Sequence, residues 1–436
     1  MPPQLNAALI IGGAIILRFI IHDRLMRPSI KLVGLIVLTT ALASGLFAQS
    51  HAEQQADSVR TLISRLNLER YKSTLRGLTQ FGDRRQGTKR NRDAIDWIEA
   101  KLKSDGCTTT ERLDYTFDQV PRTRRPPEGL LNSPDGTSTG GRIGRNGSGP
   151  GGASIFGYRR RTGVNTDPMA QPDEALRTLN SEPATDGPRQ EVFCTKVGTS
   201  HPDEMFIIGA HMDGHGWGEA ANDDGSGTAL VMELARIFNA TDVETDRSIR
   251  FVLWNNEETG LNGARAYVEQ RRELQGQEFP PGSGRYPEPR WLGMIQHDML
   301  LFDHGAPRDD GTVSRRQRPE ADVNIEFQSN SELANESRDL AFLFKAASDT
   351  YATDYPATVG PHMTNTDSIP FMNIVPSISL RENERGAHIG AGWDPHWHQP
   401  TDLYVTFTDD DFRLGLNAGQ TTLAAIAQLV GARLLR

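Results

Sequence analysis

Residues 206–213 read Phe-Ile-Ile-Gly-Ala-His-Met-Asp, an apolar run that stops at an imidazole and has a carboxylate two positions later. Two further apolar runs end at similar groups: residues 249–253 shortly precede a Glu-Glu pair, and residues 292–296 shortly precede Asp298. In an open α/β sheet, ligands bind beyond the carboxyl ends of parallel strands, so these side chains should meet in one crevice. The pattern predicts an α/β fold with a mixed, mainly parallel central sheet and helices on both faces.

Length and charge limit the classes of protein to which the chain can belong. With 436 residues, it has room for a catalytic domain with large insertions or for two domains, and we expect one domain. The net charge of −9 is mild and Lys and Arg are scattered, so nucleic acid is excluded as a partner. Apolar residues at helical spacing predict helices near residues 59–66 and 94–102.

Residues 1–52 have the layout of a targeting segment. Basic residues precede the apolar stretch 32–47, and a small-x-small cleavage site follows at residues 50–52, as in a secretory signal. Met26 stands directly before this layout and is an alternative start. We expect residues 53–436 to be an exported domain, periplasmic or extracellular. A second apolar stretch upstream leaves an N-terminal membrane anchor as the alternative; without it we expect no stable membrane contact.

Export would place the only two cysteines, Cys107 and Cys194, in an oxidising compartment where a disulfide persists. Neither lies in a Cys-x-x-Cys pair or beside the candidate ligands. We expect a structural disulfide between them, with two free thiols as the alternative.

Residues 118–190 are predicted to form a long insertion between strands expected at residues 108–117 and 191–197. The segment is dense in Gly, Pro, Ser and Arg, a composition that cannot bury enough apolar surface to offset chain entropy. We expect it to be partly disordered; a lid or a docking segment for an acidic partner is the alternative. A smaller Pro/Gly-rich insertion is expected near residues 279–290.

His211 ends the first apolar run, and Asp213 should lie on the same side of an extended chain. The Asp213 carboxylate is therefore predicted to accept a hydrogen bond from the second ring nitrogen of His211. Such a contact fixes the tautomer and raises the basicity of a metal-ligating His. This short motif is weak by itself, because a surface His-Asp pair has the same sequence.

The loop of residues 221–227, Ala-Asn-Asp-Asp-Gly-Ser-Gly, opens a helix expected over residues 228–238. Asp, Ser and Gly are common N-cap residues, so capping accounts for one of the carboxylates of Asp223 and Asp224 but not for both. A glycine-flanked turn can hold the other carboxylate rigidly enough to bridge two cations.

Glu257 and Glu258 directly follow an expected strand. Two adjacent buried carboxylates are costly without a cation, and such a pair suits a division of labour between a metal ligand and a general base acting on water. A solvated acidic turn is the alternative. Asp298 repeats the strand-then-carboxylate layout, and His398 supplies a late imidazole. Together these groups indicate a metallohydrolase.

With these motifs in order, the chain resembles the zinc aminopeptidases of the M28 family. The resemblance runs from about Ala56 to the C-terminus and rests on six ordered stretches: GAHMD, ANDDGSGTA, NNEETGLNGARAY, QHDM, TNTDSIPF and WHQPTD. It implies two zinc ions and a cis peptide after the bridging acid. Mixed nitrogen and oxygen ligands favour zinc, with Co²⁺ or Mn²⁺ able to substitute. The implied ligands are Asp223 as the bridge, His211 and Asp298 on one ion, and Glu258 and His398 on the other; Glu257 matches the general base.

The chain departs from the family pattern beside its last expected ligand. Many relatives carry Tyr there, where the hydroxyl can support the oxyanion, whereas this chain has Trp397, whose single N–H donates from a different position. Trp397 is therefore a candidate for oxyanion support or for the pocket wall. We expect His215, His388 and His396 to be outer or surface residues, and His362 and Asp367 to shape the pocket wall.

The resemblance implies a metallo-aminopeptidase that acts on peptides or aminoacyl substrates, and the layout of residues 1–52 adds the expectation of export. A glutaminyl-cyclase-like acyltransferase, a carboxypeptidase of the same fold and a non-catalytic binding domain are the alternatives; the last predicts lost ligands, and none is lost. Arg381 and Arg385 could recognise a substrate carboxylate, but we expect them to form ordinary ion pairs with Glu382 and Glu384.

Overall fold

The computed structural model describes residues 55–118, 164–305, 312–361, 366–382 and 394–435. The predicted targeting segment therefore lies outside the described residues. All of the described residues belong to one compact unit, Gln55–Arg436. None of the described helices combines the length and the apolar character that a bilayer-spanning helix requires.

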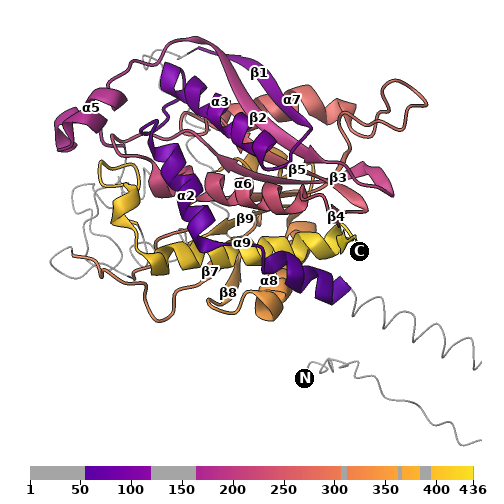
Figure 1. Ribbon diagram of the computed structural model, residues 1–436. Coiled ribbons are helices and arrows are strands. Elements are labelled where there is room, and N and C mark those ends of the chain that lie inside the picture. Colours follow the sequence, from indigo (N-terminus) through magenta and orange to yellow (C-terminus); the bar gives the residue numbers. More distant parts are fainter. Residues whose placement is uncertain (1–54, 119–163, 306–311, 362–365, 383–393, 436) are drawn as a thin grey trace, which may run out of the picture. The chain divides into compact units, whose positions relative to one another are not determined.

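An eight-stranded mixed sheet forms the centre of this unit (Figure 1), with the order β1-β2-β5-β3-β6-β9-β7-β8. The four inner strands β5, β3, β6 and β9 run parallel, while antiparallel pairing joins β1, β2 and β5 at one side and β7 with β9 at the other. The predicted fold class is confirmed. The strands are β1 Thr110–Phe117, β2 Gly187–Lys196, β3 His201–His211, β5 Arg247–Trp254, β6 Arg290–His297, β7 Val323–Glu326, β8 Ala357–Gly360 and β9 Ser377–Arg381, with β4 Val243–Glu244 and β10 Arg433–Leu434 as a separate pair.

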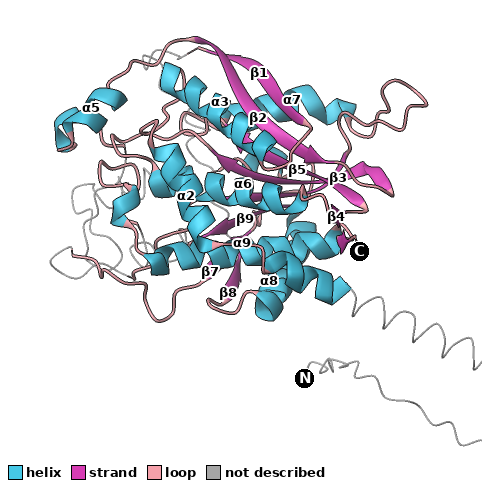
Figure 2. Ribbon diagram, viewed as in Figure 1, coloured by secondary structure: helices cyan, strands magenta, loops and turns pink. Residues whose placement is uncertain are grey.

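Helices cover both faces of the sheet (Figure 2). One face shares a large apolar core with α2, α3, α6, α8 and α9, and the other packs against α7 and the short turn η6. The helices are α2 Leu68–Thr79, α3 Lys89–Ser104, α5 Glu174–Asn180, α6 Gly227–Phe238, α7 Asn262–Arg271, α8 Ala334–Tyr351 and α9 Asp409–Leu429; shorter turns are η3 Pro168–Ala170, η4 Ala221–Ser226, η5 Arg272–Leu274, η6 Ile369–Phe371 and η7 Tyr404–Thr406, and residues 55–63 are also helical.

Burial on both faces explains the continuous apolar runs of the inner strands. In β3, Ile208 belongs to the core under α6, whereas its neighbour Ile207 belongs to the core under α7. Successive side chains of a strand point to opposite faces, so a strand covered on both sides is apolar at most positions. Arg250 in β5, which pairs with Glu288, and Gln296 in β6 are buried polar exceptions. The runs 206–210, 249–253 and 292–296 lie inside β3, β5 and β6, as expected.

The described part of the predicted insertion has more structure than its composition suggested. It contains the helix α5, and β2 already begins at Gly187. Asp173 caps α5 by accepting the N–H groups of Ala175 and Leu176, and β2 pairs with β1 from Gly187 to Cys194. Residues 119–163 lie outside the described residues. The smaller predicted insertion, by contrast, carries no helix or strand between residues 275 and 289.

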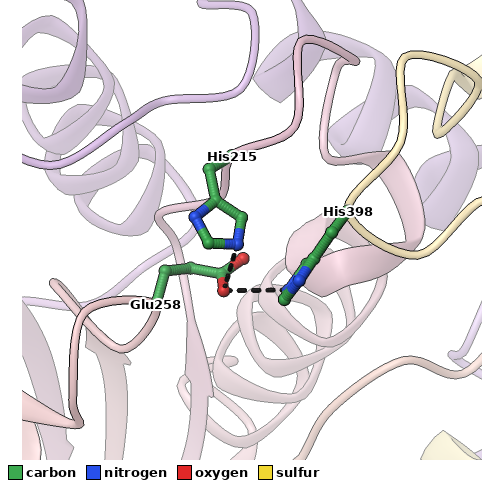
Figure 3. A group of neighbouring side chains, drawn as sticks. All are labelled: His215, Glu258 and His398. Atoms are coloured by element: carbon green, nitrogen blue, oxygen red, sulfur yellow. Dashed lines mark ion pairs between the residues drawn. The ribbon is translucent and has the colours of Figure 1, made fainter. Parts of the chain in front are cut away.

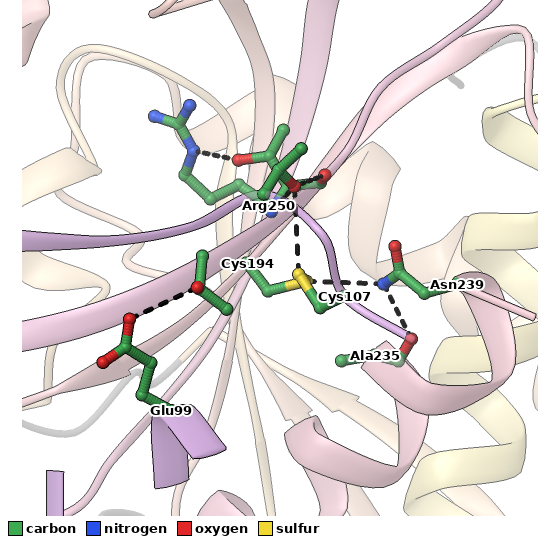
Figure 4. Close-up of a disulfide and its surroundings, with 9 residues drawn as sticks. Glu99, Cys107, Cys194, Ala235, Asn239 and Arg250 are labelled. Carbon is green, nitrogen blue, oxygen red and sulfur yellow. Dashed lines mark hydrogen bonds between the residues drawn. A yellow bond between two sulfur atoms is a disulfide. The ribbon is translucent and has the colours of Figure 1, made fainter. Parts of the chain in front are cut away.

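A disulfide joins Cys107, before β1, to Cys194 in β2 (Figure 4), which confirms the predicted pairing. The two Cα atoms are 6.1 Å apart, and both residues are buried. The side chain of Asn239, just after α6, donates to the Cys194 sulfur at 3.4 Å and to the Ala235 carbonyl at 2.8 Å. The disulfide therefore fixes the edge of the sheet beside α6.

Replacing both cysteines by serine is expected to lower the free energy of unfolding by about 2–5 kcal/mol, because the closed loop restricts the unfolded chain. The bonded residues are 87 positions apart, which makes this loop long. Denaturant titration with and without reductant measures the effect. Reductant should leave the unfolding midpoint of the double serine variant unchanged, which serves as the control. Equal stability of oxidised and reduced wild-type protein would contradict the prediction.

Candidate metal centre

The carboxyl ends of the inner strands bring the first group of predicted ligands together. His211 is the last residue of β3, and Asp298 directly follows β6. The Nε2 atom of His211 lies 3.2 Å from Oδ1 of Asp223 and 3.9 Å from Oδ1 of Asp298. All three side chains are buried. The convergence expected from the strand-end pattern is therefore present in the structure.

The same Asp223 carboxylate also faces a second group of side chains. Its Oδ2 atom lies 3.0 Å from Nε2 of His398, and that nitrogen is also 3.0 Å from Oε2 of Glu258. Asp223 thus presents one oxygen to each of two imidazoles. The five residues that the family resemblance implies as ligands lie together in one cluster.

His215 also belongs to this cluster, although sequence reasoning placed it outside. Its Nε2 atom lies 3.0 Å from Oε2 of Glu258, and Figure 3 shows both His215 and His398 directed at that oxygen. Three overlapping groups of described residues have donor atoms close enough together to hold a metal ion: His211, Asp224 and Asp298; His211, Asp223 and Glu258; and His215, Glu258 and His398.

Polar atoms without hydrogen-bond partners provide a test of whether a cation fits. Buried polar atoms normally have partners. In the described part of the chain, however, Nε2 of His211, Nε2 of His215, Oδ2 of Asp223 and Oε1 of Glu258 are buried and make no hydrogen bond. Zinc ligands at tetrahedral sites lie roughly 3.3–3.5 Å from one another, given metal–ligand distances of about 2.0–2.2 Å. The observed separations of 3.0–3.2 Å are close to this spacing, so the donor set fits zinc.

The pKa values of the imidazoles show how strongly this cluster attracts positive charge. Burial lowers the pKa of His398, but the carboxylates of Glu258 and Asp223 outweigh burial and raise it to about 9. Burial also opposes a charge on His211, yet Glu257, Asp223 and other neighbouring carboxylates raise its pKa well above the usual range. Without a metal ion, protonated imidazoles supply the positive charge that balances these carboxylates. A divalent cation bound in the cluster would supply that charge instead.

The two adjacent glutamates differ sharply in their electrostatic environment. Burial raises the pKa of Glu257 well above its usual range, and His211 only partly opposes this shift. Burial acts on Glu258 in the same direction, but the imidazoles of His215 and His398 outweigh it and lower the pKa of Glu258 to about 2. Opposite pKa shifts in two neighbouring carboxyl groups are typical of a pair in which one group transfers protons and the other stays ionised.

Asp213 supports the centre in a different way from the one predicted. Nδ1 of His211 lies 2.9 Å from the backbone carbonyl oxygen of Asp213, while the carboxylate oxygen Oδ1 is 3.9 Å away. That carboxylate oxygen instead accepts the backbone N–H of Glu257 at 3.0 Å. The prediction was wrong because β3 ends at His211, so the alternation of an extended strand no longer orients Asp213.

The two carboxylates of the Asp-Asp loop have different partners, although the N-cap residue of α6 is Ser226, whose side chain makes no capping hydrogen bond. Asp224 accepts the backbone N–H groups of Gly227 at 2.9 Å, Met299 at 3.2 Å and His211 at 3.1 Å. Its oxygens are therefore occupied by the start of α6 and by two strand ends, which leaves Asp223 to face the imidazoles. The peptide bond between Asp223 and Asp224 is cis, which confirms the detail that the resemblance implied.

A sequence model of peptidase family M28 matches residues 192–413, just over half of the chain. The chain belongs to peptidase family M28. The matched segment contains all six residues to which the resemblance gave a role. It ends close to the start of α9.

Curated relatives match this M28 chain over short segments. Aminopeptidase YwaD of Bacillus subtilis is 32% identical over 126 residues, 28% of this chain and 26% of the relative. Probable lipoprotein aminopeptidase LpqL of Mycobacterium tuberculosis is 40% identical over 82 residues, 19% and 16% of the two chains. Carboxypeptidase Q of Xenopus laevis is 34% identical over 73 residues, which are 17% of this chain and 16% of the relative. The matches thus span about a quarter of these relatives' lengths or less.

Solved structures share the fold over most of the chain. The zinc aminopeptidase BSAP from Bacillus subtilis has a TM-score of 0.55 at 16% identity and covers 84% of this chain and 95% of its own. The glutaminyl cyclase of Porphyromonas gingivalis has a TM-score of 0.50 at 14% identity, and the match covers 84% of this chain and 99% of the cyclase. At these identities the likeness establishes the fold alone.

Arg381 makes a different ion pair from the one predicted for this M28 chain. It is the last residue of β9, and its Nη2 atom lies 2.7 Å from Oδ2 of Asp298, with both side chains buried. Glu382, its predicted partner, instead accepts the side-chain amide of Asn222 at 2.7 Å and the backbone N–H of Leu301 at 3.0 Å. The end of a parallel strand aims Arg381 at the ligand cluster, which the local charge pattern did not reveal. Arg385 and Glu384 lie outside the described residues.

The remaining predicted site residues are only partly described. The indole of Trp397 stacks on the His398 imidazole with ring centroids 4.0 Å apart, so it lies beside the cluster. Asp367 is fully buried, and burial raises its pKa well above the usual range. His396 interacts through Nδ1 with the Thr401 hydroxyl at 2.8 Å. His362 and His388 lie outside the described residues.

Backbone strain is concentrated around the same cluster. Non-glycine residues with positive φ cost free energy and tend to occur at functional sites. His398 has a φ of 56°, Asn256, just before the glutamate pair, 66°, and Met299, just after Asp298, 58°. The other described non-glycine residues with positive φ are Arg84, Trp217, Ala220 and Leu261.

Proposed function

We propose that the chain is an exported, zinc-dependent aminopeptidase that hydrolyses the N-terminal bond of peptides or aminoacyl substrates. The observation that carries this proposal is the convergence of His211, Asp223, Asp298, Glu258 and His398, with separations of 3.0–3.9 Å and buried atoms that lack hydrogen bonds in the described residues. Relatives named aminopeptidase in two bacteria support the reaction. The layout of residues 1–52 and the disulfide support export.

Two zinc ions would share this donor set. His211, Asp223 and Asp298 would hold one ion, and Asp223, Glu258 and His398 would hold the other. Zinc bound there would supply Lewis acidity, which lowers the pKa of water and polarises a scissile carbonyl. Asp223 keeps one oxygen toward each imidazole, and Arg381 holds the outer oxygen of Asp298 at 2.7 Å.

Glu257 has the position and environment of a general base. Asp213 holds the backbone N–H of Glu257 at 3.0 Å, which fixes the turn that carries the side chain. Because burial raises its pKa, Glu257 accepts a proton readily. It would take a proton from the attacking water and transfer it to the leaving amine.

The charges around the centre favour recognition of a substrate amine. Arg381, the cation considered for binding a substrate carboxylate, is fully buried and pairs with Asp298 through Nη2, although its Nε and Nη1 atoms make no hydrogen bond within the described residues. Asp367 is buried and interacts electrostatically with His211 and Asp298, and its Oδ1 atom makes no hydrogen bond within the described residues. A substrate ammonium group beside Asp367 would favour the ionised form of its carboxyl group and pair with it, whereas a substrate carboxylate would be repelled by that group. We therefore propose an aminopeptidase rather than a carboxypeptidase.

Hydrolysis of matched substrates tests the proposal. Residues 53–436 should cleave dipeptides and aminoacyl anilides that have a free amine, lose this activity on chelation and regain it when zinc returns. The same substrates with an acylated N-terminus are the control and should be resistant. Cleavage of blocked peptides that carry a free carboxylate would indicate a carboxypeptidase. Release of ammonia from N-terminal glutamine, without hydrolysis, would indicate a cyclase.

A further inference from the structure

His215 contacts the Glu258 carboxylate. It is not one of the five ligands that the family resemblance implies, so this contact needs its own explanation. Its Nε2 atom and that of His398 both lie 3.0 Å from Oε2 of Glu258, and their ring centroids are 4.2 Å apart (Figure 3). The donor atoms of the three residues lie within 4.8 Å of one another. This spacing is compact enough for one ion to contact all three.

We infer that His215 is a fourth protein ligand of the ion held by Asp223, Glu258 and His398, an inference that rests on the proposed dinuclear centre. The contact between His215 and Glu258 has the distance of a hydrogen bond but not its alignment, since Nε2 of His215 has no hydrogen-bond partner among the described residues. The Nε2 atoms of His215 and His398 approach the same carboxylate oxygen at the same distance of 3.0 Å, as two ligands around a common point would.

The backbone of residues 212–220, the His215 loop, is fixed by a buried guanidinium. Arg84 donates from Nε to the carbonyl of Met212 at 2.7 Å and from Nη2 to the carbonyl of Ala220 at 2.8 Å. It thereby joins the two ends of the loop. Arg84 is fully buried, so its hydrogen bonds do not compete with solvent.

Two more side chains hold the middle of the His215 loop. Gln171 donates to the carbonyl of Trp217 at 2.8 Å and to that of Pro400 at 2.9 Å, and Asn180 donates to the carbonyl of Gly218 at 2.7 Å. Gln171 therefore links the His215 loop to the loop that carries His398. A ligand on a loop held in this way is positioned before any ion binds.

Gly216 allows the two loops to approach closely. It has a φ of +101°, and a Cβ atom at this position would lie 2.4 Å from the backbone carbonyl carbon and oxygen of His398. Only glycine fits such a contact with backbone atoms. The glycine is thus the feature of the sequence that brings the His215 ring against the His398 ring.

The inference makes the two metal positions unequal. Asp223, Glu258, His398 and His215 would give one ion four protein ligands, the number found at closed structural zinc sites. His211, Asp223 and Asp298 would give the other ion three, the number typical of catalytic sites that keep one position open. We therefore expect the ion beside His215 to be the more tightly held of the two.

X-ray absorption at the zinc edge tests the coordination directly, because scattering from the imidazole ring reports the number of His ligands. The zinc-loaded chain should show three imidazoles shared between two ions, and His215→Gln should show two. Glutamine keeps the length and hydrogen-bonding capacity of the side chain but is a poor zinc ligand. His396→Gln is the matched control, since His396 lies in the same region but interacts with Thr401, and it should retain three imidazoles.

Zinc titration provides a second readout. We expect His215→Gln to weaken binding of the tighter ion by at least about tenfold, while the unfolding midpoint of the metal-free protein stays within error of wild type. Two imidazoles in wild-type protein that binds two zinc ions would overturn the inference and leave the proposed function intact. A chain that binds no zinc would overturn both. A weaker zinc affinity with an unchanged imidazole count would also overturn it, because His215 would then act only by positioning Glu258.

Discussion

Glu257→Gln is expected to lower kcat by about 10²–10⁴-fold while zinc binding is retained, because the variant loses general-base catalysis without losing a ligand. Glutamine has nearly the same shape, so the hydrogen bond from the Glu257 N–H to Asp213 is preserved. The substitution also removes a buried carboxyl group whose pKa burial raises well above its usual range. We do not expect the substitution to lower the free energy of unfolding.

Steady-state kinetics on a free-amine anilide, together with zinc content by atomic emission, measure both halves of this prediction. Glu269→Gln is the matched control, since Glu269 lies on the exposed face of α7 and should be silent. Wild-type kcat in Glu257→Gln would exclude the general-base assignment. Loss of zinc together with activity would instead make Glu257 a ligand, which would reverse the roles of the two glutamates.

The parts of this centre that sequence reasoning predicted follow from strand geometry. His211 and Asp298 could be placed because each stands at the end of an apolar run, and parallel strands of one sheet end at the same edge. The helix start accounted for one carboxylate of the Asp-Asp loop and left the other to explain, but the capping argument did not say which was which. The assignment of Asp223 as the bridge came from the family resemblance.

The parts that sequence reasoning missed depend on loops that leave the regular elements. Asp213 lies beyond the end of β3, so strand alternation no longer orients its side chain. His215 reaches Glu258 only because Arg84, distant in sequence, ties its loop and because Gly216 packs on the backbone of His398. The glycine content of residues 214–218 was a visible signal, since closely spaced glycines permit close approach of two backbones.

Arg381 shows a different limit of sequence reasoning. Its neighbour Glu382 made a local ion pair the simplest expectation, yet β9 ends at Arg381 and Glu382 lies in the bend that follows. The structure pairs Arg381 with Asp298, 83 positions away, because β9 and β6 are neighbours in the sheet. Strand order is set by packing of the whole domain, and local charge patterns carry no information about it.

Asp223→Ala is expected to remove both zinc ions, whereas His398→Ala should remove only one. The difference follows from the two oxygens of Asp223, which lie 3.2 Å from the His211 nitrogen and 3.0 Å from the His398 nitrogen. A carboxylate shared in this way belongs to both positions. Its loss also removes one of the carboxylates that each imidazole faces, although Glu258 stays beside His398 and Asp298 beside His211.

Zinc content per chain after gel filtration in metal-free buffer distinguishes these outcomes. Activity should fall to background in Asp223→Ala, and added zinc should not restore it at concentrations that saturate the wild type. Asp354→Ala, which removes an exposed carboxylate, should keep full zinc content. Circular dichroism of the metal-free proteins separates loss of metal from loss of fold. Full zinc content in a folded Asp223→Ala protein would exclude the bridging role, and loss of a single ion would assign Asp223 to only one position.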